Sequence, residues 1–296
     1  RRVKYGSRNV IVASPSLPSR LGDKRVIRYN ETGIGLYQAS AVYSPVLVHK
    51  LIEGYLTKCK NPVDGVMNLI NPKTLIREEV NLKPKQIDKW LTPTGLFKTI
   101  DSLSDQHIRN TPIMVGSHYL GLVYKDDKYF RLLNDVNDLA ESDLKIENVH
   151  PVTYGELFYI HGYEWYQDYP ATVTRYPING YRSIYPTIPH VLTTNRNFDL
   201  IPLDENLKPR EGISAPHYPD TTDDNWFDAM VPASSRLGGL GADFDGDMVN
   251  FNPIFSDEAR LGVKKYLNSK AAYLNSAGQL LNNPFHETLE RILYSL

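Results

Sequence analysis

The chain contains very little cysteine, no long apolar run and almost no net charge. Cys59 is the only cysteine among the 296 residues. A disulfide within the chain, or a zinc site built from several thiolates, is therefore excluded, and this usage is typical of an intracellular protein. No apolar stretch approaches the ~18 residues of a membrane-spanning helix, and the N-terminus lacks the charged and then apolar pattern of a secretion signal. We therefore expect neither membrane insertion nor secretion.

Internal repeats and low-complexity tracts are also absent, and the length allows one large domain or two small ones. The formal charge of −1 gives no indication of nucleic-acid binding, but the charges are unevenly distributed. Residues 1–28 contain eight Arg or Lys and one acid, whereas residues 220–247 contain seven Asp and a single basic residue, Arg236. A basic arm and an acidic segment in one chain fit a site that holds phosphates and metal together, although an ordinary basic surface segment is the alternative.

Aspartates alternate with Phe244 and Gly246 near the end of the chain. On an extended strand the outer two would lie roughly 13 Å apart, and on a helix the middle one would point away. Only a tight loop lets Asp243, Asp245 and Asp247 converge, and Gly246 allows such a loop. Converging carboxylates need a hard cation to neutralise them. The pattern therefore predicts a Mg²⁺ or Ca²⁺ site rather than a zinc site.

The acidic run has three other interpretations. The simplest is a solvated acidic surface loop. A calcium loop of the EF-hand type needs Gly at its sixth position and Glu at its twelfth, but counting from Asp243 these positions hold Met248 and Ile254, so this interpretation fails. A phosphatase of the haloacid dehalogenase family also carries D-x-D-G, but its nucleophilic Asp ends a buried apolar strand. Here Leu237-Gly-Gly-Leu-Gly-Ala precedes the run, and the phosphatase is kept as an alternative.

The run Asp243 to Asp247 resembles the signature of the largest subunit of multisubunit DNA-dependent RNA polymerases, the subunit called β′ in bacteria. Further segments resemble other motifs of the same family. In chain order these are residues 1–12 (RRVKYGSRNVIV), 174–177 (TRYP), 250–253 (NFNP), 256–259 (SDEA) and the tail 283–294. Their order, and the spacing of those that follow the acidic run, agree with the family.

The resemblance covers residues 1–14, 170–192 and 231–296. Between the first two blocks little matches beyond an expected helix at residues 43–47. That segment is longer than we expect in bacterial enzymes, which favours a divergent polymerase of the type encoded by large bacteriophages. The expected location is the cytoplasm of an infected bacterium or the phage virion. Because the chain begins directly on a motif, we expect it to be a fragment of a longer subunit.

The fold implied by the resemblance is α+β, with a double-psi β-barrel core, an inserted mixed module and C-terminal helices. The aspartate loop would project from the barrel. The expected divisions are residues 1–14 (first part of the barrel, with a template-contacting arm), 15–165 (inserted mixed α/β module), 166–255 (remainder of the barrel, with the metal loop) and 256–296 (C-terminal helices).

The implied activity is transfer of a nucleotidyl group from a nucleoside triphosphate to the 3′ end of RNA during transcription. Two Mg²⁺ ions about 3.5–4 Å apart would serve this reaction. The aspartates Asp243, Asp245 and Asp247 would hold one ion, and the other would arrive with the nucleotide. Activity would require a β-like second large subunit, other polymerase subunits, a DNA template and the RNA product. An inactive structural barrel subunit is a further alternative.

Four arginines match family positions that contact nucleic acid or nucleotide. Arg175 matches the arginine that reaches the ribose of the incoming nucleotide, although an arginine paired with a carboxylate at the barrel surface is the alternative. The family carries Asn where this chain has Gly241, which leaves the discrimination of ribose open. Arg2 and Arg8 match arginines that contact the template backbone, and Arg182 matches one less closely.

Local patterns predict several elements directly. Residues 10–12 and 171–174 have the composition of strands, and residues 113–132 predict a hairpin around Lys125-Asp-Asp-Lys. Ser256 is expected to cap a helix, with acids in its first turn and lysines late. A second C-terminal helix is expected to begin at Asn283, with Pro284 at its first position.

Overall fold

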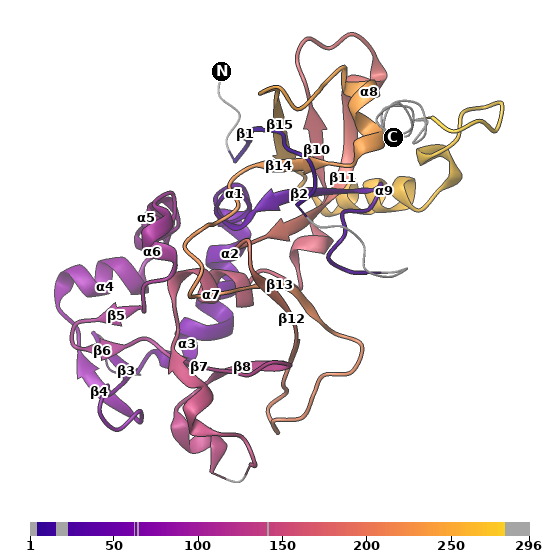
Figure 1. Cartoon of the computed structure of the whole chain (residues 1–296). Helices are drawn as coiled ribbons and strands as arrows, with labels where there is room; N and C mark the ends of the chain where they lie inside the picture. Colours follow the sequence, from indigo (N-terminus) through magenta and orange to yellow (C-terminus); the bar gives the residue numbers. More distant parts are fainter. Residues whose placement is uncertain (1–4, 16–22, 62, 64, 141, 282–296) are drawn as a thin grey trace. The chain divides into compact units, whose positions relative to one another are not determined.

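The computed structural model describes residues 5–15, 23–61, 63, 65–140 and 142–281. The chain forms two compact units (Figure 1). Unit 1 comprises Arg1–Val42, Trp165–Leu192 and Asp228–Leu296, and unit 2 comprises Tyr43–Glu164 and Thr193–Phe227. Each unit is built from segments that are far apart in the sequence. Helices and strands are mixed in the chain as a whole, which confirms the α+β class.

Unit 1 contains a nearly closed, barrel-like sheet of six strands. In spatial order these are β1 (Ser7–Val10), β15 (Met248–Pro253), β10 (Ala171–Thr174), β11 (Ile184–Leu192), β2 (Glu31–Gly35) and β14 (Met230–Pro232). β11 and β2 are parallel, and the other ladders are antiparallel. The two ends of the sheet meet where the Val12 amide donates to the Met230 carbonyl at 2.9 Å and Ile11 forms a parallel bridge to Met230. The barrel expectation is confirmed in this general form.

Alternation along β15 separates the interior of the barrel from its outer surface. Val249 and Phe251 are completely buried, whereas Met248 between the acidic loop and Val249 is exposed. Side chains alternate sides along a strand, so the apolar pair fills the interior. The buried hydroxyls of Thr32 and Thr187 pair with each other at 2.8 Å. This packing gives the acidic loop a rigid strand at its C-terminal end.

Helix α9 (Asp257–Leu267) begins where the sequence predicts. Ser256 occupies the cap position, although its side chain makes no capping hydrogen bond within the described residues. Acids stand in the first turn and lysines in the last, which suits the helix dipole. Arg260 attaches the helix to unit 1, donating to the Asp168 carbonyl at 3.0 Å and stacking over the Tyr169 ring at 3.8 Å. The helix predicted from Asn283 lies outside the described residues.

The remaining helices in the described part of unit 1 are short. They are α1 (Leu36–Val42), α8 (Leu237–Leu240) and the 3₁₀ turns η4 (Tyr166–Asp168), η5 (Tyr181–Ser183), η6 (Ser234–Arg236) and η7 (Lys270–Ala272). Of these, η6 and α8 lead directly into the acidic loop. The strand predicted at residues 171–174 is confirmed as β10.

The described residues of unit 2 form two sheets. The larger has the order β13 (Ala215–Pro219), β12 (Asn197–Pro202), β8 (Tyr129–Leu133), β7 (Leu122–Lys125) and β9 (Val149–Pro151). The smaller has the order β4 (Arg77–Asn81), β3 (Val66–Ile70), β6 (His118–Tyr119) and β5 (Met114–Val115). Its helices are α2 (Ser44–Leu51), η1 (Ile52–Leu56), α3 (Thr57–Cys59), α4 (Pro84–Leu91), α5 (Pro93–Ser102), α6 (Gln106–Arg109), η2 (Val136–Leu139), η3 (Ile146–Asn148) and α7 (Tyr154–Ile160).

The predicted hairpin around Lys125-Asp-Asp-Lys is confirmed for its second half. β7 and β8 pair antiparallel, and the Asp126 carboxylate accepts the amides of Lys128 and Tyr129 at 2.8 and 2.7 Å. The first part of the predicted range forms a separate short hairpin, β5–β6. Helix α2 confirms the helix expected near residues 43–47.

The units divide the chain differently from the expected boundaries. β2 and α1 lie within the range 15–165 expected as an insertion, yet they belong to unit 1, because β2 pairs in parallel with β11. The segment Thr193–Phe227 was expected in the barrel but belongs to unit 2, where β12 extends the sheet of β7 and β8 and Leu203 packs into the same core as Leu133. Both differences arise from pairing between distant segments.

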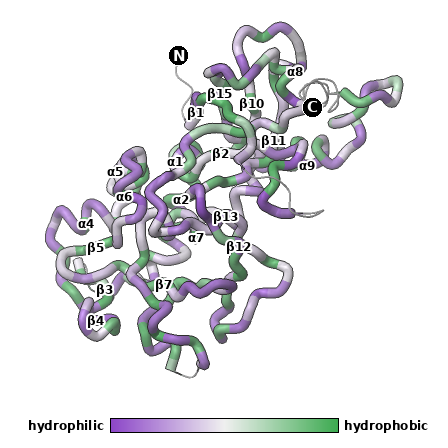
Figure 2. The backbone as a smooth tube through the Cα atoms, viewed as in Figure 1, coloured by the Kyte–Doolittle hydropathy of each residue, from purple (hydrophilic) through white to green (hydrophobic). Residues whose placement is uncertain are grey.

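Hydropathy varies over short distances along the chain (Figure 2). Apolar stretches drawn in green are interrupted by polar ones in both units. Among the residues that the structure describes, none of the helices combines the length and the apolar character needed to cross a membrane.

Candidate metal centre

The acidic loop connects α8 to β15. Gly241 ends α8 in the left-handed conformation, with φ of +59°. Gly246, between two of the aspartates, has φ of +114°, which L side chains rarely adopt. A Cβ at Gly246 would meet no described atom within 4 Å, so backbone conformation and not space requires glycine there. The loop turns where the sequence predicts because these two residues permit it.

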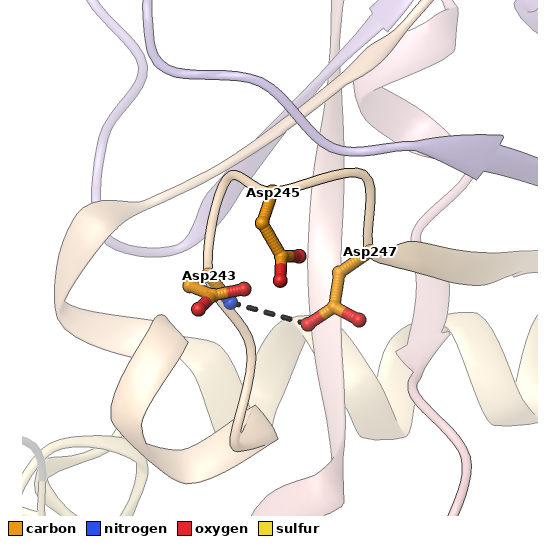
Figure 3. A group of neighbouring side chains, drawn as sticks. All are labelled: Asp243, Asp245 and Asp247. Atoms are coloured by element: carbon orange, nitrogen blue, oxygen red, sulfur yellow. Dashed lines mark hydrogen bonds between the residues drawn. The ribbon is translucent and has the colours of Figure 1, made fainter.

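The aspartate side chains converge. One carboxylate oxygen from each of Asp243, Asp245 and Asp247 lies within 4.8 Å of the others. Figure 3 shows the three carboxylates on the inner side of the loop, with Asp245 between its neighbours. The sequence-based prediction of a converging loop is therefore confirmed. Asp243 and Asp245 are exposed and Asp247 is half-buried, so the cluster is open to solvent and to a ligand.

The spacing allows the three residues to hold one metal ion. With metal–oxygen distances of about 2.0–2.1 Å for Mg²⁺ and 2.3–2.6 Å for Ca²⁺, three oxygens spread evenly around one ion lie at most about 3.6 and 4.5 Å from each other. The three carboxylate oxygens lie within 4.8 Å of one another, so a slight closing of the loop would let all three hold either ion. An all-carboxylate ligand set suits a hard cation. The geometry thus supports a divalent metal site without choosing between these ions.

Electrostatics within the cluster are unfavourable in the absence of a cation. The hydrogen bond with Asp243 and the negative charges of Asp243 and Asp247 raise the pKa of Asp245. The pKa of Asp247 is lowered, mainly because Arg175 donates a hydrogen bond to it. The charge of Asp247 is therefore already balanced by Arg175, whereas the carboxylates of Asp243 and Asp245 face each other. A bound cation would relieve this repulsion.

Arg175, which follows β10, contacts both ends of the loop. Its Nη2 donates to Oδ1 of Asp247 at 2.9 Å and lies 2.9 Å from Oδ2. Its Nη1 donates to the Leu240 carbonyl at 3.3 Å. Of the two interpretations of Arg175, the structure displays the pairing with a carboxylate. The contact with a nucleotide ribose stays a prediction.

Backbone hydrogen bonds anchor the loop at three further points. The Asp243 amide donates to Oδ2 of Asp247 at 3.2 Å, the bond drawn as a dashed line in Figure 3. The Ala242 amide donates to the Leu237 carbonyl at 3.1 Å, and the Ile11 amide donates to the Asp247 carbonyl at 2.9 Å. The last bond joins the end of the loop to the N-terminal segment that the resemblance singled out.

The structure describes two of the other three arginines that were predicted to contact nucleic acid. Arg8 is exposed on β1 and pairs across the ladder with Asn250 of β15. Arg182 is exposed in η5, which packs against α8. Arg2 lies outside the described residues. The structure thus places Arg8 on the strand beside β15 and Arg182 beside α8, while their contacts with a template stay predictions.

Arg236 was not predicted to have a role. It is almost buried at the end of η6, and its guanidinium lies 4.0 Å from the ring of Tyr29 and 4.8 Å from that of Tyr185. Two aromatic faces therefore fix the residue that precedes α8. In the sequence, Arg236 is distinguished only as the single basic residue of the acidic segment 220–247.

Comparison with models of known protein families gave no match for this sequence. A search of curated proteins also gave no match. The polymerase resemblance therefore rests on the motifs of the chain itself, and the activity that it implies is a proposal.

Proposed function

We propose that this chain is the catalytic segment of a β′-like subunit of a DNA-dependent RNA polymerase. The observation that carries the proposal is the convergence of Asp243, Asp245 and Asp247 in a loop that leaves a nearly closed barrel. Each residue offers a carboxylate oxygen to the same point, and the loop is open to solvent. This arrangement suits a reaction whose substrates are phosphates accompanied by metal.

The spatial arrangement of the resembling segments supports the same proposal. β1 lies in the N-terminal segment, β10 ends at the start of the TRYP motif, and β15 follows the aspartates. In the sheet β15 lies between β1 and β10, so that Asn250 pairs with Arg8 on one side and with Thr174 on the other. Segments that are far apart in the sequence thus meet at the acidic loop. We propose that this six-stranded sheet is a double-psi barrel.

In the proposed reaction, residues of this chain would hold the metal ion and contact the template. Mg²⁺ bound at the loop would make the RNA 3′-hydroxyl more acidic and stabilise charge on the α-phosphate as pyrophosphate leaves. Asp243 and Asp245 provide exposed oxygens, and Asp247 is oriented by Arg175. Arg8 and the Arg2 segment would contact template phosphates, and a β-like subunit with further polymerase subunits would complete the enzyme.

The two alternatives have less support. A phosphatase of the haloacid dehalogenase type needs its nucleophilic Asp at the end of a buried strand, whereas Asp243 follows the short helix α8. An inactive structural barrel would have no need to keep all three carboxylates on one point. We therefore place the proposed polymerase first, with the inactive barrel as the second candidate.

RNA synthesis by the complete assembled complex tests the proposal. Asp245→Ala should remove extension of a primer on a DNA template with Mg²⁺, while assembly and template binding persist. Asp127→Ala is the matched control, because Asp127 is an exposed aspartate at the tip of the β7–β8 turn in unit 2. Extension that persists in the Asp245 variant would place the chemistry in another chain and favour the inactive barrel.

A further inference from the structure

The acidic loop is held at both ends by one side chain. Leu240 precedes the loop and Asp247 ends it, and the two Nη nitrogens of Arg175 reach one each. The backbone of Arg175 is itself fixed, since its amide donates to the Ser183 carbonyl at 3.1 Å. Arg175 also follows β10 directly, and β10 is paired with β15, the strand that the loop enters. The guanidinium therefore links the α8 end of the loop to the β15 end.

The loop needs such a link more than an ordinary turn does. Two of its residues, Gly241 and Gly246, have backbone conformations that only glycine adopts freely, and glycine also gives the unfolded loop many alternatives. Its carboxylates repel one another when no cation is present. Asp243 and Asp247 lie near opposite ends of the loop, so their separation depends on how firmly those ends are joined.

Only arginine has the geometry for this link. Its planar fork directs separate donors to separate acceptors, whereas a lysine ammonium is a single point. A Cβ at Gly241 would lie 3.6 Å from Nη1 of Arg175, an ordinary contact distance, so the α8 end of the loop lies directly beside the fork. The Arg175 side chain is 20% exposed, so water competes only partly for these bonds.

We propose that Arg175 is a positioning residue of the metal loop, which joins Leu240 to Asp247 and keeps the carboxylates converged before any nucleotide arrives. The inference rests on the proposed function in taking the loop as the metal site, but the ordering of the loop is a property of the metal-free chain. Arg175 uses one N–H group on the Leu240 carbonyl and Nη2 on Asp247. The rest of the guanidinium stays available for a substrate contact, so positioning and substrate binding are compatible.

Two measurements on the full chain test the inference in Arg175→Lys, Arg175→Ala and the control Arg196→Ala, which removes an exposed arginine from unit 2. The first is amide hydrogen exchange of residues 237–248 without metal. A lysine keeps the charge but cannot join both ends, so exchange at the Ala242 and Asp243 amides should rise roughly tenfold in both Arg175 variants. Arg196→Ala should match the wild type.

The second measurement is Mn²⁺ affinity by electron paramagnetic resonance. Positioning predicts that Arg175→Lys binds Mn²⁺ roughly tenfold more weakly than the wild type. If Arg175 acted only as a nearby positive charge, Arg175→Lys would bind like the wild type and Arg175→Ala more tightly, and this result would overturn the inference. Unchanged exchange in both variants would overturn it as well.

A failure of the proposed function looks different. Faster exchange in the variants of a chain that binds no Mn²⁺ would support the link made by Arg175 and refute the metal site. Loss of RNA synthesis in Asp245→Ala with unchanged exchange in Arg175→Lys would support the polymerase and overturn the positioning role.

Discussion

Carboxylates lie in opposite environments in the two units. In unit 1 the aspartates of the acidic loop lie near the surface and face one another. In unit 2 Glu156 of α7 is completely buried and receives hydrogen bonds from three residues. Tyr218 donates at 2.9 Å, Thr153 donates through its amide and its hydroxyl at 3.1 and 3.0 Å, and His150 Nε2 lies at 2.8 Å.

The pKa shifts of Glu156 and Asp245 differ in direction because the two carboxylates have different neighbours. Burial opposes the charge of Glu156, but the hydrogen bonds and the charge of His150 lower its pKa overall. Asp245 has mainly other carboxylates as neighbours, and its pKa is raised. A buried carboxylate that the protein itself satisfies stabilises the fold, whereas an exposed cluster offers its oxygens to water or to a cation. The difference separates a structural network from a candidate functional site.

The largest expected effect on stability is in unit 2. Glu156→Ala leaves the donors of Tyr218 and Thr153 unpaired in the interior, and we expect a loss of roughly 3–5 kcal/mol in the free energy of unfolding. Urea unfolding followed by fluorescence measures this. Glu205→Ala, at an exposed glutamate of the same unit, should change little. A small effect of the Glu156 substitution would mean that the network is dispensable and that the comparison is wrong.

Metal binding should stabilise unit 1, whereas the substitution of Glu156 destabilises unit 2. A ligand that binds only the folded chain adds about 2.7 kcal/mol at a concentration of 100 times Kd. We therefore expect Mg²⁺ or Mn²⁺ to raise the melting temperature of the wild type, and chelation with EDTA to reverse the shift. Asp245→Asn should abolish the response, whereas Asp127→Asn should retain it. An equal response in both variants would locate the ion elsewhere.

Backbone conformation should matter more in the acidic loop than side-chain burial does. At Gly246, with φ of +114°, alanine is strained, and Gly246→Ala should cost about 1–3 kcal/mol and weaken Mn²⁺ binding. Gly241 is left-handed with φ of +59°, a region that asparagine tolerates. Gly241→Asn should therefore cost less than about 1 kcal/mol, as measured by urea unfolding. A reversed order of the two variants would contradict the conformational role.

The smallest expected effect is a difference in pH dependence. The lowered pKa of Glu156 means that its contribution to stability is present above the ordinary carboxyl pKa and is lost as pH falls through the lowered folded value. The raised pKa of Asp245 has the opposite sign, because its contribution is present at low pH and is lost as pH rises through the folded value.

Urea midpoints between about pH 3 and pH 7 would separate these contributions. Glu156→Gln should flatten the decline on the acid side, and Asp245→Asn should leave that decline in place. Saturating Mg²⁺ should suppress the Asp245 contribution in the wild type. Identical profiles for the two variants would show that neither carboxylate titrates as the structure indicates.

Some elements followed directly from local sequence. The turn Lys125-Asp-Asp-Lys places Asp126 where its carboxylate accepts the next amides, and strand composition flanks it on both sides. The N-terminus of α9 at Ser256 and strand β10 were predicted equally well. The converging loop was predicted because neither a strand nor a helix brings three alternating aspartates together, whereas Gly246 permits a tight turn that does.

Other features could not be predicted in this way. Glu156 begins as a local capping box with Thr153, but its partner Tyr218 comes from β13, far along the chain. Likewise, no local pattern predicts that Arg236 contacts the rings of both Tyr29 and Tyr185. Such contacts depend on which distant segments are brought together by burial of the whole core.

The sequence by itself determined the acidic loop, because the conformational freedom of Gly246 and the alternation of Asp243, Asp245 and Asp247 act over a few adjacent residues. Only the tertiary structure decided that Arg175 pairs with Asp247 and that β2 joins β11. It also decided that residues 193–227 belong to unit 2 and not to the barrel. These outcomes depend on pairing and packing between segments remote in sequence, whose free energy no local pattern contains.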